Sequence, residues 1–438
     1  MGAAIEDDSL AAAIGRKILS RLVAPTALFV LMGSIDRTNI GFAALQMNKA
    51  LGLSGTQYGW GAGVLFVGYM VAKYPSVLLY ERIGVRRWLA AISFVWGASA
   101  CLLATISNGW QLYALRMVIG FAEGGLSSGL MIYLSNWAIE RHKASILAVP
   151  IMAQSIAQVI GAPISGILLD SANPFGIEGW RFLFLAEGLP SLALAVFALA
   201  YYPDAPAEAR WLSTGERRWV ADNVRGAPLR ARGERAGAGR WDALKNPLGW
   251  TCALIWLCIL AGNYGIIFWL PQIVKGLAGL TASQTGWVVS LPWAGSAIGL
   301  YLNARHSDRT QERYLHVGVP ALVGGSGLLL AYALGPGLPG LIALVVGGAC
   351  TGCTVAAFWA IPMRLLPPGS LSMGIVMINV VGSLAGATVP ALMGYLTERS
   401  GSFFPATLLL FAISVACAGL CLVARLADRP RQALSLAE

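Results

Sequence analysis

Apolar residues run through this 438-residue chain in long, nearly continuous stretches that polar loops separate. A membrane-spanning helix needs about 20 mainly apolar residues, because its backbone polar groups must all be satisfied inside the helix. The stretches are too long, and alternate too little, for the ~10-residue strands of a membrane β-barrel. We therefore predict twelve transmembrane helices, at about residues 22–46, 56–80, 88–107, 110–136, 144–170, 180–202, 248–271, 284–304, 314–335, 338–362, 371–397 and 403–424.

A long polar segment divides these helices into six and six. Residues 203–247 contain nine basic and six acidic side chains. Two six-helix halves are typical of transporters built from related repeats. We predict an all-α membrane protein with two six-helix bundles related by pseudo-two-fold symmetry. The expected parts are a cytoplasmic tail at 1–21, an N-terminal bundle at 22–202, a cytoplasmic central loop at 203–247, a C-terminal bundle at 248–424 and a cytoplasmic tail at 425–438.

Composition excludes a soluble protein. Hydrophobic residues make up 57% of the chain, charged residues only 12%, and the mean hydropathy is +0.66. A soluble domain carries roughly a quarter charged residues. Of the 31 basic residues, 24 lie in the tails and loops on one predicted side of the membrane. The positive-inside rule makes that side cytoplasmic and places both termini there. The net charge of +10 thus follows from topology and does not indicate nucleic-acid binding.

Five ionisable residues fall inside the predicted helices, all in the first half: Asp36, Arg37, Lys73, Arg116 and Glu123. A charge near the bilayer centre costs at least ~2.5–3.5 kcal/mol, so such residues are functional by default. Arg116 and Glu123 share a helix face but lie roughly 10 Å apart along the axis, too far for a direct bridge. Asp36 and Arg37 are adjacent and point about 100° apart. One of them can therefore meet a substrate while the other faces a neighbouring helix.

Two interpretations of this charged set remain open. The residues form structural ion pairs between helices, or they form an anion site with a titrating carboxyl group. Arginine suits anion binding because its fork binds a carboxylate bidentately and stays charged. A buried carboxyl suits proton transport because desolvation favours its neutral form, whereas a nearby Arg favours its charged form. No His lies at the predicted midplane, so Asp36 and Glu123 are the candidate proton carriers.

The other candidates are neutral. They are Tyr69, Gln154, Trp359 and Asn379. Each also suits a hydrogen bond between helices. Tyr69 is one turn from Lys73 in the predicted second helix, so we expect these two residues to share a face. Cys350 and Cys353 have redox spacing, but no His or second Cys pair joins them, and we interpret them as small buried residues. We expect no cofactor, no metal and no covalent step.

Several motifs resemble transporter signatures. Tyr80-Glu-Arg-Ile-Gly-Val-Arg-Arg-Trp88 resembles the G-x-x-x-D-R-x-G-R-R loop of the major facilitator superfamily, and Ser307-Asp-Arg309 is a weaker echo of it. Asp36-Arg-Thr-Asn-Ile-Gly-Phe-Ala43 and Arg116-Met-Val-Ile-Gly-Phe-Ala-Glu123 resemble the anion:cation symporter family, most of all its bacterial tartrate, phthalate and hydroxyphenylacetate carriers. The loop resemblance implies a gating latch, whose residues here are Glu81, Arg82, Arg86, Asp308 and Arg309.

The resemblance also implies roles inside the membrane. Asp36 and Glu123 match the family's proton-coupling positions. Arg37 and Arg116 match its carboxylate-binding positions. The four neutral candidates match substrate-contact positions by spacing. Lys73 stands where relatives usually carry Glu or Gln, so the site has an added cation. This cation either favours a doubly charged or sulfonated anion, or neutralises a nearby carboxylate of the protein.

These inferences combine into one expectation and two rivals. We expect a monomeric, multi-pass protein of a bacterial inner membrane that imports a small organic anion together with protons by alternating access. One rival is a proton-driven drug or metabolite exporter of the same fold, with an apolar pocket and no need for Arg37 or Arg116. The other rival, a membrane enzyme or sensor, needs a nucleophile–base pair, a metal cluster or a soluble domain, and we find none in the sequence.

Overall fold

The computed structural model describes residues 2–138, 143–171, 175–223 and 244–435, and this part of the chain is almost entirely helical. The first half contains α1 (Gly2–Ile18), η1 (Leu19–Val23), α2 (Ala24–Ala50), α3 (Gly55–Leu102), η2 (Leu103–Thr105), α4 (Gly109–Glu123), α5 (Leu126–Ser135), α6 (Lys143–Asp170) and α7 (Gly179–Tyr201). The second half contains α10 (Pro247–Ala278), α11 (Ala282–Thr310), α12 (Leu315–Leu334), α13 (Leu338–Gly352), α14 (Thr354–Leu365), α15 (Pro368–Ser400) and α16 (Phe404–Ser435).

The predicted twelve-helix membrane fold is confirmed. Ten helical segments of the described chain are long and apolar enough to cross a membrane. One of them includes the 48-residue α3, which at 1.5 Å per residue reaches about 70 Å and is long enough for two crossings. Gly84 divides α3, because its φ of 79° is outside the helical region. A further crossing is α11, which packs along α6 and α13 and carries charged residues only in its last turns.

Helices also occur in segments that the sequence predicted as tails and loop. Residues 2–18 form α1, which continues through η1 into α2, and α16 extends to residue 435. The segment between the halves contains η4 (Pro206–Glu208) and α8 (Thr214–Asn223). Lys17 Nζ donates to Glu216 Oε1 on α8 at 2.7 Å, and this hydrogen bond lowers the pKa of Glu216. Residues 224–243 of the predicted central loop and 436–438 of the predicted tail lie outside the described residues.

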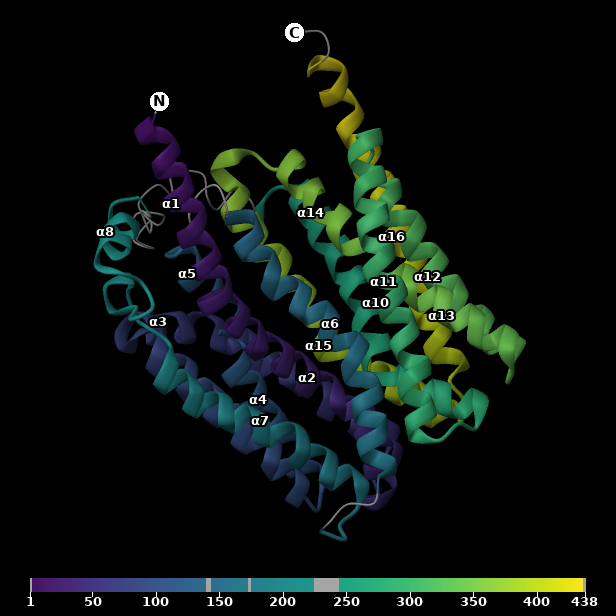
Figure 1. Cartoon of the computed structure of the whole chain (residues 1–438). Coiled ribbons are helices and arrows are strands. Elements are labelled where there is room, and N and C mark those ends of the chain that lie inside the picture. The colour runs from purple at the N-terminus through teal and green to yellow at the C-terminus, as the bar shows by residue number, and fades with distance from the viewer. Residues whose placement is uncertain (1, 139–142, 172–174, 224–243, 436–438) are drawn as a thin grey trace.

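The two halves pack tightly at the end of the molecule away from the termini (Figure 1). There α3 packs on α15, α6 on α11, and α2 on α10. Gly59 shows how close the approach is, because a Cβ placed on it would lie 2.3 Å from the backbone oxygen of Pro390. The lack of a side chain at Gly59 therefore permits this close contact between α3 and α15.

Hydrogen bonds between the halves reinforce this closed end. The Tyr58 hydroxyl donates to the backbone oxygen of Phe268 at 2.7 Å. The Ser283 N–H donates to Asp170 Oδ2 at 2.7 Å, which joins the start of α11 to the end of α6. Each of these bonds must break when the halves separate at this end.

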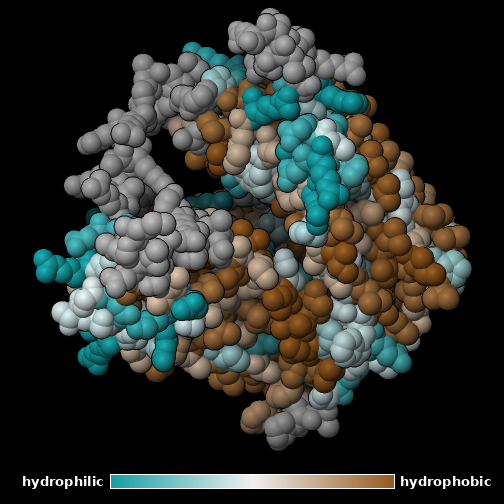
Figure 2. Space-filling view, turned by 45° about the horizontal axis from the view of Figure 1, so that its top comes forward, coloured by the Kyte–Doolittle hydropathy of each residue, from teal (hydrophilic) through white to brown (hydrophobic). Residues whose placement is uncertain are grey.

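Toward the termini the two halves diverge (Figure 1). Figure 2 shows the molecule hollowed on this face, between the halves, with hydrophilic surface inside the hollow. The outer surface around it is largely hydrophobic, as a lipid-facing surface must be (Figure 2). The molecule is therefore closed at one end and open at the end that carries both termini.

Candidate functional site

An ion pair between α2 and α4 is the centre of the candidate site. Arg37 Nη2 donates to Glu123 Oε2 at 2.9 Å, and Arg37 Nε donates to the same oxygen at 3.3 Å. The side chain of Arg37 is 16% exposed and that of Glu123 is 0% exposed. The expected 100° turn between Asp36 and Arg37 explains this arrangement, because it directs Arg37 to α4 and Asp36 elsewhere.

Two cations flank the ring of Tyr69 on α3. The Arg37 guanidinium carbon lies 5.5 Å from the ring centroid, and Lys73 Nζ lies 5.3 Å from it. Tyr69 and Lys73 are one turn apart, so the predicted shared face is present. Tyr264 of α10 also interacts electrostatically with Arg37 and Tyr69. The second half therefore contributes a hydroxyl group to a site whose charges belong to the first half.

Arg116 is placed differently from Arg37. Its side chain is 0% exposed, and it donates to the backbone oxygens of Asp36 at 3.5 Å and Arg37 at 3.4 Å. Among the ion pairs of the described chain, none joins Arg116 to a carboxylate. In this conformation Arg116 therefore binds the backbone of α2 and does not reach the hollow.

Asp36 faces α3 and α7. It is 3% exposed, and its Oδ2 accepts hydrogen bonds from Trp96 Nε1 and, at 3.1 Å, from Ser191 Oγ. Its Oδ1 has no donor in the described chain. The structure thus separates Asp36 from the Arg37–Glu123 pair, although the two residues are neighbours in sequence.

Glu187 is a buried acid that the sequence analysis missed. It lies on α7, inside the predicted span 180–202, and is 2% exposed. Its Oε1 accepts a hydrogen bond from Ser165 Oγ at 2.8 Å. The count of five intramembrane ionisable residues was therefore wrong. The rule that identified the other five, a charge inside an apolar span, also identifies this one.

Among the described residues, the remaining neutral candidates form no hydrogen bond and no cation–π contact with the charged set in this conformation. Gln154 is exposed on α6. Trp359 on α14 packs on Trp256, with ring centroids 4.9 Å apart. Asn379 on α15 donates to the backbone oxygen of Ile375 in its own helix. Of the four, the structure brings only Tyr69 to the charged residues.

The predicted latch residues interact within their own halves. Glu81, Arg82 and Arg309 are exposed. The backbone N–H of Arg86 donates to Asp204 Oδ1 at 2.9 Å, directly after the turn at Gly84. Asp308 pairs with Arg313 at 2.5 Å. In the described chain no latch residue forms an ion pair across the open end.

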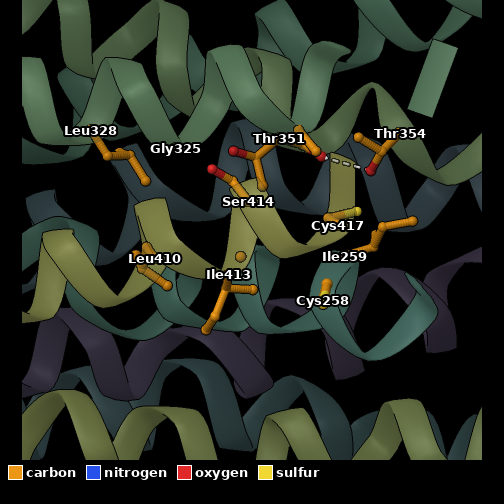
Figure 3. Close-up of a pocket in the computed structure, with 12 residues that line it drawn as sticks. Cys258, Ile259, Gly325, Leu328, Thr351, Thr354, Leu410, Ile413, Ser414 and Cys417 are labelled. Atoms are coloured by element: carbon orange, nitrogen blue, oxygen red, sulfur yellow. Dashed lines mark hydrogen bonds between the residues drawn. The ribbon is translucent and has the colours of Figure 1, made fainter. Parts of the chain in front are cut away.

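A separate cavity in the second half has a different character. It lies among α10, α12, α13, α14 and α16, and Figure 3 shows its lining. The lining residues include Cys258, Thr351, Ser414 and Cys417, with apolar and small residues and no Asp, Glu, Lys, Arg or His. Such a lining offers no cation to pair with a carboxylate. The anion candidate site therefore remains the charged cluster on α2, α3 and α4.

Comparison with known proteins identifies the family. A family model described as Major Facilitator Superfamily matches residues 26–390 and 279–437. The chain belongs to the major facilitator superfamily. It is a multi-pass membrane transporter and not an enzyme, as the sequence predicted.

Curated relatives within the superfamily differ in their named substrates. An Agrobacterium vitis protein named "Putative tartrate transporter" is 35% identical over 90% of this chain and 88% of its own length. The Acinetobacter baumannii "Quinolone resistance transporter" is 32% identical over 91% of this chain and 93% of its own. The Escherichia coli "Inner membrane transport protein RhmT" is 31% identical over 87% of this chain and 88% of its own. The expected resemblance to tartrate carriers is confirmed, and a relative named for quinolone resistance matches the chain as well.

Solved structures of the superfamily share the fold. A bacterial homologue of the human lysosomal transporter Spinster, solved in an inward-facing and unoccupied conformation, superposes with a TM-score of 0.73 at 17% identity and covers 92% of this chain and 95% of its own. A D-xylose–proton symporter superposes with a TM-score of 0.72 at 16% identity, covering 92% and 97%. At such identities the likeness concerns the fold alone.

Proposed function

We propose that this superfamily member is a proton-coupled symporter that imports a small organic anion, a carboxylate, by alternating access. The observation that carries the proposal is the Arg37–Glu123 pair, in which a partly exposed guanidinium is bound to a fully buried carboxylate. Arg37 presents a permanent positive charge at the site, and Glu123 provides a group that can take a proton. Both requirements of anion–proton symport thus meet in one contact.

Competition for Arg37 couples the two ligands. A substrate carboxylate that binds the guanidinium replaces Glu123 as its partner. A buried carboxylate without its cation is strongly destabilised, so Glu123 then takes a proton. By linkage, protonation of Glu123 frees Arg37 and strengthens anion binding to the same extent. Anion and proton therefore load together, and the neutralised site permits the halves to reorient.

Other residues complete the site in this proposal. Lys73 and Tyr69 border the anion next to Arg37, and Tyr264 approaches from the second half. Gln154, Trp359 and Asn379 shape the pocket as the halves come together. Arg116 fixes α2 in this conformation and helps hold the carboxylate when the opposite end opens. Asp36 is the second proton carrier.

The distribution of basic residues gives the orientation of the protein in the membrane, and the two bundles give its movement. We place both termini in the cytoplasm and the protein, as a monomer, in a bacterial inner membrane, consistent with its bacterial relatives. The hollow in Figure 2 then faces the cytoplasm. Bundles 22–202 and 248–424 rock against each other, and the latch residues near Arg86 and Asp308 engage when the hollow closes.

The alternative is an exporter of drugs or metabolites, favoured by the quinolone-resistance relative. An exporter of cationic or neutral compounds gains nothing from Arg37 and Lys73 next to the same tyrosine ring. Two positive charges there repel a cation and attract an anion. The charge of the site therefore favours the symporter.

Reconstituted protein tests the proposal. In proteoliposomes, a pH gradient with the acidic side outside should drive accumulation of a dicarboxylate such as tartrate inside. Glu123→Gln should abolish this accumulation but retain part of the exchange of internal for external anion. Glu208→Gln, a change at an exposed acid, is the matched control. If accumulation driven by the pH gradient is unchanged in Glu123→Gln, Glu123 does not couple proton movement to transport. Uptake of quinolones but not of anions would favour the exporter.

A further inference from the structure

A second buried carboxyl group lies beside Asp36, away from the arginine pair. Glu187 on α7 is 2% exposed and interacts electrostatically with Asp36. Ser191, one turn later on α7, donates to Asp36 Oδ2. Asn39, one turn after Asp36 on α2, interacts with the side chain of Glu187. The two helices therefore hold two acids together through reciprocal contacts.

The hydrogen bonds of this cluster leave acceptors without donors. Asp36 Oδ2 is satisfied by Trp96 and Ser191, and Glu187 Oε1 by Ser165. Asp36 Oδ1, Glu187 Oε2 and Asn39 Oδ1 are buried and have no donor in the described chain. A charged carboxylate only accepts hydrogen bonds, whereas a protonated one also donates. Each proton added to the acids therefore removes one buried charge and gives the cluster an O–H donor.

No ion pair of the described chain includes either acid, although Arg116 interacts electrostatically with Asp36. Arg116 on α4 directs its Nη atoms to backbone oxygens of α2, and Arg37 is engaged with Glu123. The titratable group that α3 presents to Asp36 is the Cys101 thiol, and α6 contributes the neutral Ser165. Glu123 is the further acid that acts on Asp36, and its charge adds repulsion. Arg116 can compensate at most one of the two buried negative charges, and neither acid is in an ion pair, so the cluster retains at least one proton.

We propose that Glu187 is a third proton-carrying residue of the transporter, which titrates together with Asp36 in a buried cluster of two carboxyl groups that forms no ion pair with an arginine. The inference rests on the proposed proton-coupled symport and adds a residue to it. An O–H bond forms at Glu187 Oε2 or Asp36 Oδ1 when a hydronium ion on one side gives up a proton and becomes water. The bond breaks when the proton passes to water on the other side, which becomes hydronium.

The contacts also explain how the pair responds to movement. Ser191 and Glu187 lie on one face of α7, and Asp36 and Asn39 lie on the facing surface of α2. A shift of α7 along α2 changes the hydrogen bonds of both acids together. Such a shift between the two end states alters the proton affinity of the pair as a unit.

The test measures protons and anions together. Glu187→Gln keeps the shape of the side chain and an oxygen for Ser165, and it adds N–H donors for the unpartnered oxygens. In proteoliposomes with a pH indicator, this variant should carry one proton fewer per anion than the wild type, and anion exchange should persist. Its uptake should also depend on pH over a shifted range. Glu178→Gln, at the exposed start of the same helix, is the control and should match the wild type.

A spectroscopic measurement keeps the proposal testable if the variant transports poorly. At neutral pH the purified wild type should show an infrared carbonyl band from protonated carboxylic acid, and Glu187→Gln should lose part of it. An unchanged proton ratio and an unchanged band in Glu187→Gln would overturn the role of Glu187, while leaving Glu123-dependent symport standing. Absence of any proton movement with the anion in the wild type would instead refute the proposed function.

Discussion

Arg37 on α2 donates two N–H groups to a single oxygen of Glu123 on α4, from Nη2 at 2.9 Å and from Nε at 3.3 Å. The other carboxylate oxygen, Oε1, is buried and has no donor among the residues that the structure describes. A guanidinium binds a carboxylate best through two parallel hydrogen bonds to its two oxygens. Arg37 does not bind Glu123 in this way, because both of its hydrogen bonds go to one oxygen. A substrate carboxylate that offers both oxygens is a better partner for Arg37 than Glu123 is.

The first prediction concerns the stability of this pair. Arg37→Ala leaves the Glu123 charge buried without a cation, which should lower the free energy of unfolding by about 3–5 kcal/mol. Adding Glu123→Gln removes that charge and should recover most of the loss. Thermal unfolding of the purified single and double variants in detergent measures both effects. If the double variant is as unstable as Arg37→Ala, the two residues are not coupled in this way.

The second prediction separates the two arginines. Lysine keeps the charge of either residue but loses the fork. Arg37→Lys should weaken anion binding about tenfold, equal to about 1.4 kcal/mol, because Arg37 is partly exposed beside Tyr69. Arg116→Lys should weaken it less, because Arg116 is 0% exposed and binds the α2 backbone in this conformation. Titration calorimetry with tartrate measures both affinities. A larger loss in Arg116→Lys would make Arg116 the principal anion ligand.

Hydrophobic patterning predicted the fold because a lipid environment leaves few alternatives. Each crossing must be a long apolar helix, so the twelve spans could be identified with boundaries a few residues off. Helical continuity across the loops was less predictable. The residues around Gly84 form the single turn that divides α3, and the polar loop contains the amphipathic α8. Such features depend on local contacts, such as that of Glu216 with Lys17, rather than on hydropathy.

The candidate site could be predicted residue by residue but not contact by contact. Helix periodicity tells which residues share a face, and it correctly gave Tyr69 with Lys73 and separated Asp36 from Arg37. It does not tell how one helix is positioned along another, so the partner of Glu123 was not predictable. The position of Arg116 also depends on conformation, which sequence alone does not specify. Glu187 was available to the sequence argument and was overlooked.

The third prediction concerns substrate charge. Lys73 Nζ lies 5.3 Å from the Tyr69 ring centroid, on the ring that Arg37 also approaches. Lys73→Gln removes one of two positive charges and should reduce the preference for dianions over monoanions several-fold, with less effect on monoanion affinity. Competition of mono- and dicarboxylates against a labelled substrate measures the ratio. Lys49→Gln, at the exposed end of α2, is the control. An unchanged ratio in Lys73→Gln would assign Lys73 a structural role.

The fourth prediction concerns the closed end. A Cβ at Gly59 would lie 2.3 Å from the oxygen of Pro390 and 2.6 Å from Cα of Ala391, and neither backbone atom can move without shifting α15. Gly59→Ala should therefore disfavour closure at this end by about 1–3 kcal/mol, the usual cost of overpacking. Each 1.4 kcal/mol changes the ratio of the two conformations about tenfold, so the population should shift toward opening at this end.

Spin labels at positions 49 and 399, at the ends of α2 and α15, report this shift in a cysteine-free background. Gly59→Ala should lengthen the distance distribution between the labels. Gly419→Ala on α16 adds the same methyl group where no atom lies within 4 Å, so its distribution should match the parent protein. Because the two variants differ only in what the methyl group meets, an unchanged distribution in both would mean that the contact of α3 with α15 does not control closure.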